Sequence, residues 1–241
     1  MLVIQLLKLW QILFFIGLTC GLAYGTLRNG KKEINDKNIT IIGSSNIDST
    51  LIIKKSKNLL PNSLLDIQPK QLKKTLKENL PIKRISIKRI LFPPHIEINI
   101  LEMDPIAYAT RKRSKGLENG MLDIDANWIP IEIIKSKIKD KNVLKVEGWM
   151  EIHRLSIRKI FDNKDKFPSP IKKIVFHHDG EIIIETNNLK EIQLGTNTNL
   201  LDQKIMALNY LSKNLPSQLK GKIKSVDLRN LSQPELQIAK P

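Results

Sequence analysis

A long uncharged run near the start of the chain constrains how the rest can be organised. Residues 9–27, LWQILFFIGLTCGLAYGTL, contain no charged side chain and few strongly polar ones. At 1.5 Å per residue, a helix of this length is about long enough to cross a hydrocarbon core of roughly 30 Å. Trp10 and Tyr24 lie near its ends, where aromatic side chains suit the two membrane interfaces. We therefore expect a transmembrane helix over residues 9–27, after a short cytoplasmic tail over residues 1–8.

A cleaved secretory signal is the alternative for this run. Residues 23–25 supply the small side chains that a signal peptidase requires, but the apolar run is longer than a typical signal core, which favours a retained anchor. Both alternatives export the rest of the chain. The flanking charges disagree with export, because only Lys8 and the amino terminus precede the run as cations. Arg28, Lys31 and Lys32 follow it, so the positive-inside rule by itself favours a cytoplasmic C-terminus.

The chain is strongly basic, with a formal net charge of +16 over 241 residues. Such a charge suits binding to nucleic-acid phosphates, and it also suits a position beside an anionic membrane surface. Aromatic residues do not alternate with the basic ones, as binding to a single strand would require. The one cysteine, Cys20, excludes an internal disulfide framework and a zinc site built on cysteines.

Residues 83–107 have the pattern of an antiparallel hairpin. Isoleucine alternates with polar residues on both sides of a double proline, which places the apolar side chains on one face. Proline lacks the N–H that a strand ladder needs, so the chain turns at residues 92–94. The cations between the isoleucines are predicted to lie on a solvated face. The isoleucines of the buried face are Ile85, Ile87, Ile96, Ile98 and Ile100.

One strand and two helices are predicted ahead of this hairpin. Residues 39–43 form a short strand that ends in a glycine-containing turn, and Asp48 or Ser49 caps a short helix. Residues 66–81 hold an amphipathic helix with a proline in its first turn, a leucine at every fourth position and a proline that ends it. These side chains are Pro69, Leu72, Leu76, Leu80 and Pro81.

This order of elements, with its motifs, resembles the POTRA domain of the bacterial cell-division family FtsQ, also called DivIB. Ile82 stands where the family usually has an aromatic residue. The resemblance implies a POTRA domain over residues 38–107, built as β-α-α-β-β, after a linker over residues 28–37. The matching stretches are Ile42-Gly43, Leu80-Pro81, Ile87-Lys88-Arg89-Ile90 with Pro93-Pro94, and Glu102 to Ala107. The structural residues carried over from these motifs are Gly43, Pro81, Arg89 and Pro105.

The second half of the chain resembles the other domain of that family. Residues 122–130 resemble its first strand and turn, with Asn127 near the usual glycine, where we expect a left-handed backbone. The acidic residues of this turn do not form a calcium loop, because Trp128 stands where such a loop needs glycine and Ile134 where it needs a bidentate glutamate.

Further motifs follow in the order of the family. They are the strand 143–148, a hairpin over residues 171–187 that turns at residues 178–180, a strand through 193–195 followed by a helix, and the Val-Asp-Leu-Arg strand at 226–229. The resemblance implies an FtsQ-type β-domain over residues 108–241, mostly antiparallel and with a C-terminal helix-strand unit, so the whole chain is predicted to be α+β. The structural residues carried over here are Gly148, Gly195, Asp227, Leu228 and Arg229.

The sequence has no glycine-rich phosphate loop, and His177 and His178 are predicted to lie at a solvated hairpin tip. We therefore predict a protein that is not an enzyme, with no catalytic, cofactor-binding or metal-binding residues. The last strand candidate, with Leu236, Gln237 and Ile238, is predicted to be an exposed edge that accepts a strand from a partner, with Leu236 and Ile238 on the buried side.

The resemblance implies a bitopic scaffold of the bacterial divisome. It would lie in the inner membrane at the septum with its C-terminal part exported, and it would hold FtsB- and FtsL-like coiled-coil partners, without a specific nucleic acid or a small-molecule substrate. The two alternatives are a basic nucleic-acid-binding protein and a POTRA-containing component of outer-membrane transport. The second needs a barrel of many strands, and the residues after 107 are too few for one.

Overall fold

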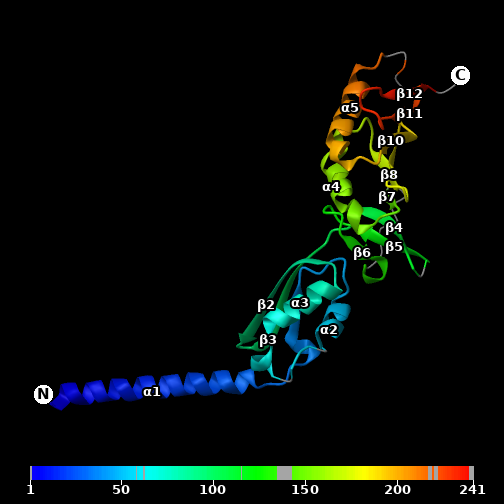
Figure 1. Cartoon of the computed structure of the whole chain (residues 1–241). Helices are drawn as coiled ribbons and strands as arrows, with labels where there is room; N and C mark the ends of the chain where they lie inside the picture. Colours follow the sequence, from blue (N-terminus) through cyan, green and yellow to red (C-terminus); the bar gives the residue numbers. More distant parts are fainter. Residues whose placement is uncertain are drawn as a thin grey trace. The chain divides into compact units, whose positions relative to one another are not determined.

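A computed structural model of the chain divides into two compact units, Met1–Glu102 and Met103–Pro241 (Figure 1). Residue 1 of the predicted tail and residues 239–241 of the predicted β-domain lie outside the described residues. The structure describes residues 2–57, 59–61, 63–114, 116–134, 143–216, 219 and 222–238.

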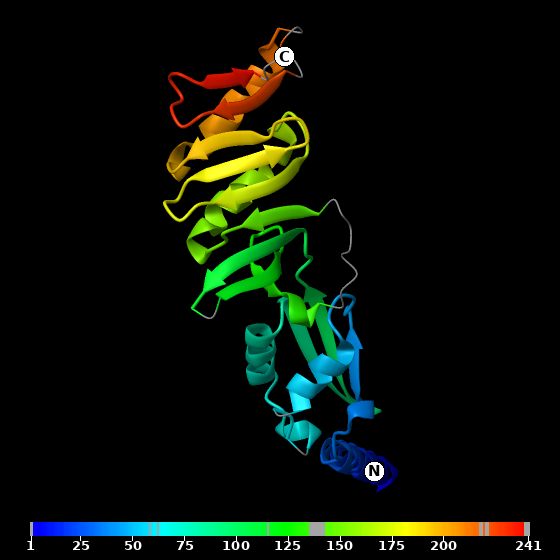
Figure 2. The same cartoon turned by 90° about the vertical axis from the view of Figure 1, so that its right-hand side faces the viewer.

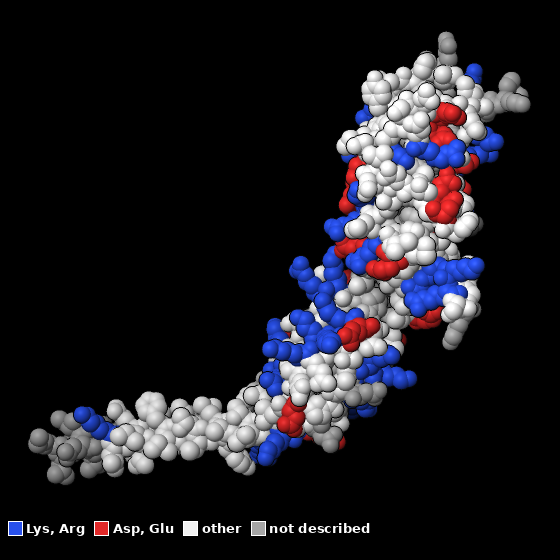
Figure 3. Space-filling model, in the orientation of Figure 1, with Lys and Arg blue, Asp and Glu red and all other residues white. Residues whose placement is uncertain are grey.

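Unit 1 begins with the long helix α1 (Leu2–Gly30). Its part from Lys8 to Gly30 is long and apolar enough to cross a membrane, and the apolar 18-residue window within it is not buried in the protein. Figure 3 shows that this face of the helix is almost free of charged side chains. An apolar helix left bare in this way matches the environment that a hydrocarbon core provides.

The rest of unit 1 is a three-stranded sheet with two helices, in the strand-helix-helix-strand-strand order that the sequence predicts. The sheet order is β1-β3-β2, in which β1 is parallel and β2 antiparallel to β3. Two single turns of 3-10 helix, η1 and η2, flank these elements. The bounds are η1 (Asp36–Asn38), β1 (Ile39–Ile42), α2 (Ser49–Lys57), η2 (Leu64–Asp66), α3 (Pro69–Asn79), β2 (Ile82–Leu91) and β3 (Pro94–Glu102).

Local hydrogen bonding and proline explain where the two helices of unit 1 begin, and buried apolar side chains join helix and sheet. Asp48 Oδ1 accepts a hydrogen bond of 3.0 Å from the Thr50 N–H, which satisfies a donor in the first turn of α2. Pro69 occupies the first position of α3, where the missing N–H costs no hydrogen bond. Leu72 and Leu76 of α3 are buried, as are the hairpin isoleucines Ile85, Ile96, Ile98 and Ile100, so helix and sheet share one core.

Unit 2 forms one mixed sheet, nine-stranded within the described residues, in the order β12-β11-β10-β9-β8-β7-β4-β5-β6. The pairs β4–β7, β7–β8 and β10–β11 are parallel and the other five are antiparallel, which agrees with a mostly antiparallel domain. The strands are β4 (Ala107–Arg113), β5 (Gly116–Leu122), β6 (Trp128–Pro130), β7 (Leu144–Glu147), β8 (Ile171–Phe176), β9 (Ile182–Thr186), β10 (Glu191–Gly195), β11 (Ile223–Asp227) and β12 (Glu235–Ile238).

Helices α4 (Arg154–Asp162) and α5 (Leu201–Asn214) lie on one face of this sheet (Figures 1 and 2). Each connects two parallel neighbours, α4 between β7 and β8 and α5 between β10 and β11, because parallel strands need a long crossover. Apolar side chains from both helices and the strands form one buried cluster. The connections also contain short 3-10 turns, η3 (Ile131–Ile133), η4 (Glu151–His153), η5 (Lys164–Lys166) and η6 (Thr198–Leu200).

The expectation of a left-handed backbone at Asn127 is wrong, because the positive φ, 58°, belongs to Ala126. Asp123 is only 2% exposed, so its carboxylate needs hydrogen-bond donors. Asn127 supplies two of them, through its backbone N–H at 2.7 Å and its Nδ2 at 2.8 Å. Asn127 therefore closes the turn by hydrogen bonding to Asp123, and the residue with positive φ is the one before it, Ala126.

Candidate partner-binding edge

Strand β12 lies at one end of the sheet order of unit 2. It pairs antiparallel with β11, with Leu236 opposite Val226 and Gln237 opposite Ser225. No second strand pairs with it in the part of the chain that the structure describes. Half of the N–H and C=O groups of such an edge strand point away from the sheet and can accept another strand.

Strand β6, at the opposite end of the same sheet, is less able to accept a further strand. Strand β6 has three residues and ends in Pro130, which has no N–H to offer a partner. The Arg111 guanidinium lies 4.0 Å from the centre of the Trp128 ring and makes a bidentate hydrogen bond to Glu118, at 2.7 and 2.9 Å. Strand β12 contains no proline and carries exposed apolar surface, so it is the more receptive of the two edges.

The side chains of β12 differ in their environments. Leu236 packs against the buried cluster, whereas Gln237 is exposed and its Oε1 accepts a hydrogen bond of 3.0 Å from the Ser225 hydroxyl. Ile238 is 50% exposed, so the expectation that it lies on the buried side with Leu236 is wrong. It pairs with Ile223, the first residue of β11, beyond a register shift.

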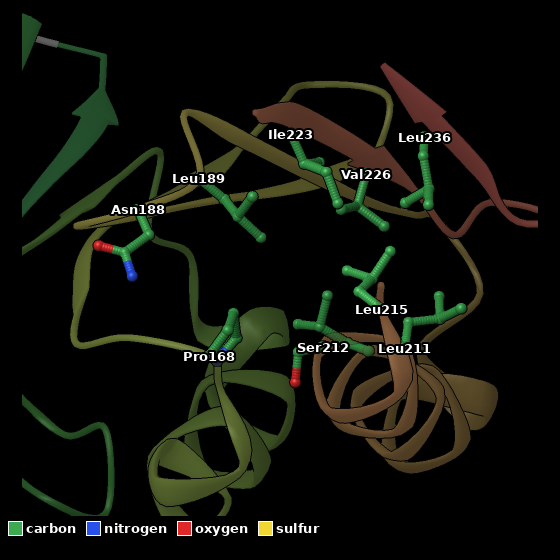
Figure 4. Close-up of a pocket in the computed structure, with 10 residues that line it drawn as sticks. Pro168, Asn188, Leu189, Leu211, Ser212, Leu215, Ile223, Val226 and Leu236 are labelled. Carbon is green, nitrogen blue, oxygen red and sulfur yellow. The ribbon is translucent and has the colours of Figure 1, made fainter. Parts of the chain in front are cut away.

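An apolar hollow of about 330 Å³ lies between α5 and strands β11 and β12. Figure 4 shows leucine side chains in α5 and at its C-terminal end, and apolar side chains of the strands, pointing toward one another around it. Leu211 and Leu215 line it from the helix side, and Val226 and Leu236 from the sheet. A strand added to β12 would present alternate side chains to the same face of the sheet as this hollow.

The predicted motif residues of the C-terminal strand come together beside β12. The Leu228 N–H donates to the Gln193 carbonyl at 2.8 Å, and the Leu228 side chain is fully buried. Arg229 Nη2 donates to Asp227 Oδ2 at 2.6 Å, and the hydrogen bonds from Arg229 lower the pKa of Asp227. Gly195 has φ +67°, and a Cβ there would lie 3.1 Å from Cγ of Arg229. These residues fix the end of β11, against which β12 pairs.

Lys204 of α5 was not identified as a buried residue from the sequence. It is 1% exposed, and its Nζ donates to the Leu194 carbonyl. Burial lowers the pKa of Lys204, while the charge of Asp227 acts in the opposite direction. Its helical spacing from Leu201 and Leu208 was the available signal, because it places Lys204 on the buried stripe of the helix.

The remaining motif residues have structural contacts within their own units. In unit 1, Gly43 has φ +86°, and a Cβ there would overlap the Ile100 carbonyl. Pro81 is buried directly after α3. Arg89 Nη1 donates to the Leu65 and Ile67 carbonyls at 3.0 and 3.4 Å. Pro105 lies between β3 and β4, and Gly148, with φ +73°, ends β7. None of these five belongs to the β12 edge.

The described residues contain no group of three or more His, Cys, Asp and Glu side chains that would hold a metal ion. His177 and His178 lie at the β8–β9 turn as predicted, with His177 N–H bonded to the Glu181 carbonyl at 2.9 Å. His153 is buried and stacks on the Phe176 ring at 4.2 Å, and burial lowers its pKa.

The fold of unit 1, a three-stranded sheet with two helices, defines a POTRA-like module. Residues 34–103 match the family model of the POTRA domain, FtsQ-type. This segment is an FtsQ-type POTRA domain, and the predicted resemblance is confirmed for it. Domains of this family are modules for protein–protein interaction and not for catalysis. No curated protein matches the chain.

Proposed function

We propose that the chain is a non-enzymatic scaffold of the bacterial divisome, of the FtsQ/DivIB type. The observation that carries this proposal is the FtsQ-type POTRA domain at residues 34–103. Residues 9–27 anchor the chain in the inner membrane, and the exported POTRA domain (38–107) and β-domain (108–241) link early and late division proteins at the septum. Imaging a fluorescent fusion in dividing cells tests this role, and an even distribution around the membrane would contradict it.

The edge strand β12 is the proposed docking site for FtsB- or FtsL-like partners. A strand of the partner adds to it through main-chain hydrogen bonds, and an apolar side chain of that strand enters the hollow beside Leu236. The exposed Ile238 offers further contact area at the open end of the edge. The short length of β12 limits exposure of the edge when no partner is bound.

A matched pair of variants at Gln237 tests this docking site. Gln237→Pro removes one N–H and fixes φ, so the edge should lose partner recruitment, whereas Gln237→Ala keeps the N–H and should recruit nearly as well as the native chain. Deletion of residues 234–241 should act like the proline variant. The measurement is a pull-down of division partners by the full-length variants, with their thermal unfolding recorded beside it. Normal recruitment by the deletion variant would move the site to the POTRA domain or to the strand at 226–229.

The proposed orientation needs a separate test, because Arg28, Lys31 and Lys32 follow the anchor. A reporter that is active only outside the cytoplasm, fused after Pro241, should be active, and the fusion should stay with membranes after a salt wash. Activity confined to a cytoplasmic reporter would reverse the proposed orientation.

A further inference from the structure

The last turns of α1 and the turn between β2 and β3 lie against each other in unit 1. A Cβ added at Gly25 would lie 3.7 Å from Cζ of Phe92, an ordinary van der Waals distance, so the ring lies beside the bare glycine. Leu65 fills the space at Gly30, and the Ser63 hydroxyl donates to the Gly30 carbonyl at 2.9 Å. The first contact places the β2–β3 turn beside the last turns of α1, and the contacts at Gly30 hold residues 63–65 against the C-terminal end of the helix.

This turn and the helix present one exposed apolar surface. Phe92 is 57% exposed, and Tyr24 and Leu27 of α1 are 67% and 55% exposed. Pro93, next to Phe92, is exposed as well. Aromatic side chains at the end of a membrane-crossing helix favour the layer between hydrocarbon and water, which is where the contact with Gly25 places the Phe92 ring.

Cations follow directly along the helix axis. Arg28, Lys31 and Lys32 are exposed, and none of them forms an ion pair with a residue that the structure describes. Glu33 lies next to them in sequence and offsets one of the three charges. Figure 3 shows Lys and Arg side chains where α1 meets the rest of the unit. Arg28 follows Gly25 by three residues, or about 4.5 Å along a helix, so the cations lie roughly a headgroup's depth above the Phe92 ring.

We propose that the β2–β3 turn docks on the bilayer that α1 crosses. Phe92 enters the interfacial layer, and Arg28, Lys31 and Lys32 bind the phosphates of acidic phospholipids. The occupant is a lipid surface because the contact with Gly25 brings Phe92 to the end of the membrane-crossing helix, and because the cations match the charge of acidic headgroups. This inference rests on the proposed anchoring by α1. Binding of acidic headgroups by Arg28, Lys31 and Lys32 does not depend on the side of the membrane on which the C-terminal part of the chain lies.

The test places a nitroxide label at Phe92 in the full-length chain. Phe92→Cys in a Cys20→Ser background is labelled and reconstituted into vesicles of phosphatidylethanolamine with phosphatidylglycerol, or of phosphatidylcholine alone. The matched control is Leu101→Cys, because Leu101 is also exposed, at 52%, and lies near the other end of β3. The label at position 92 should collide readily with oxygen and poorly with a water-soluble nickel chelate, and the label at position 101 should show the reverse. The position-92 label should lie deeper in the vesicles that contain phosphatidylglycerol.

The triple variant Arg28→Gln, Lys31→Gln, Lys32→Gln should abolish that dependence on phosphatidylglycerol. Equal accessibility at positions 92 and 101 would overturn the docking of the turn, and so would a position-92 label shielded from both collision partners, which would indicate protein contact. A depth that is the same in both kinds of vesicle would overturn the binding of acidic headgroups. Release of the chain from vesicles at alkaline pH would instead refute the anchor, and with it the proposed function.

Discussion

Replacing Gly148 by alanine tests the close approach that shapes unit 2 where β7 ends. Gly148 has φ +73°, and a Cβ there would overlap the backbone carbonyl oxygen of Phe176 in the neighbouring strand β8. The left-handed backbone alone costs alanine about 1–2 kcal/mol. The overlap adds about 1–3 kcal/mol, because a strand carbonyl cannot move without disturbing its ladder. We expect Gly148→Ala to lower the free energy of unfolding of unit 2 by about 3 kcal/mol in all.

Gly180→Ala is the matched control. Gly180 also has a left-handed backbone, with φ +88°, but a Cβ there would meet open space. Only the backbone cost applies, so the loss should be about 1 kcal/mol. The difference between the two variants isolates the cost of the contact with Phe176.

Thermal unfolding of the full-length chain in detergent measures both losses. A domain of this size shifts its midpoint by about 2–4 °C for each kcal/mol, so Gly148→Ala should melt about 9 °C lower and Gly180→Ala about 3 °C lower. Trp149, which is buried directly after Gly148, reports the transition by fluorescence. Equal shifts for the two variants would refute the argument, because they would show that β8 accommodates the added methyl at no cost.

Three further predictions concern buried or half-buried polar groups of unit 2. Burial lowers the pKa of His153, so between its folded pKa and about 6.5 the unfolded state binds more protons than the folded state. The free energy of unfolding is therefore highest above pH 6.5 and falls as the pH drops toward the folded pKa. Urea titrations from pH 7.5 to 5 should show a smaller fall in the free energy of unfolding for His153→Leu than for the native chain. Lys204→Ala should cost about 2 kcal/mol more in urea titration than Lys204→Met, because methionine keeps the buried stem of about three methylene-sized groups. Arg111→Lys should lose about 1 kcal/mol in the same assay, because lysine cannot bind Glu118 bidentately while stacking on Trp128, and the Glu118→Gln background should reduce that loss.

Unit 1 was largely predictable from the sequence because its signals are local. The alternating isoleucines around residues 92–94 fix a hairpin whose strands are neighbours in the chain, and the prolines at 69 and 81 bound a helix whose buried leucines repeat every four residues. Only β1 needs a distant partner, and its parallel pairing with β3 was not predicted, because no local pattern specifies it.

Unit 2 was less predictable because its decisive pairings are not local. Helix α4 was missed, although Ile157, Ile160 and Phe161 have helical spacing, because nine residues between 3-10 turns give a weak periodic signal. Its position between the parallel strands β7 and β8 makes it the crossover that parallel pairing requires, and no short window of sequence contains that information.

The proposed docking edge, strand β12, depends on both local and non-local signals. The strand at residues 235–238 was predictable, and so was its last place along the chain, but its place at the end of the sheet depends on the order of nine strands. The exposure of Ile238 was missed because alternation shows which face a side chain shares with Leu236 but not how far the packed face extends, and Ile238 is the last residue of β12. The hollow beside Leu236 requires α5, which no analysis of the strand alone could supply.

The net charge of +16 does not by itself favour the membrane over other anionic partners. Screening limits the attraction of an exposed cation for an acidic surface to about 8–10 Å at physiological salt. Arg28, Lys31 and Lys32 satisfy this limit if the proposed anchor crosses the membrane, because the chain places them directly after it. Many other cations are already neutralised, as Lys173 is by Glu147 at 2.8 Å and Lys159 by Asp202 at 3.0 Å. The location of a few unpaired cations beside α1, rather than the total charge, therefore decides whether the basic character of this chain acts on lipid.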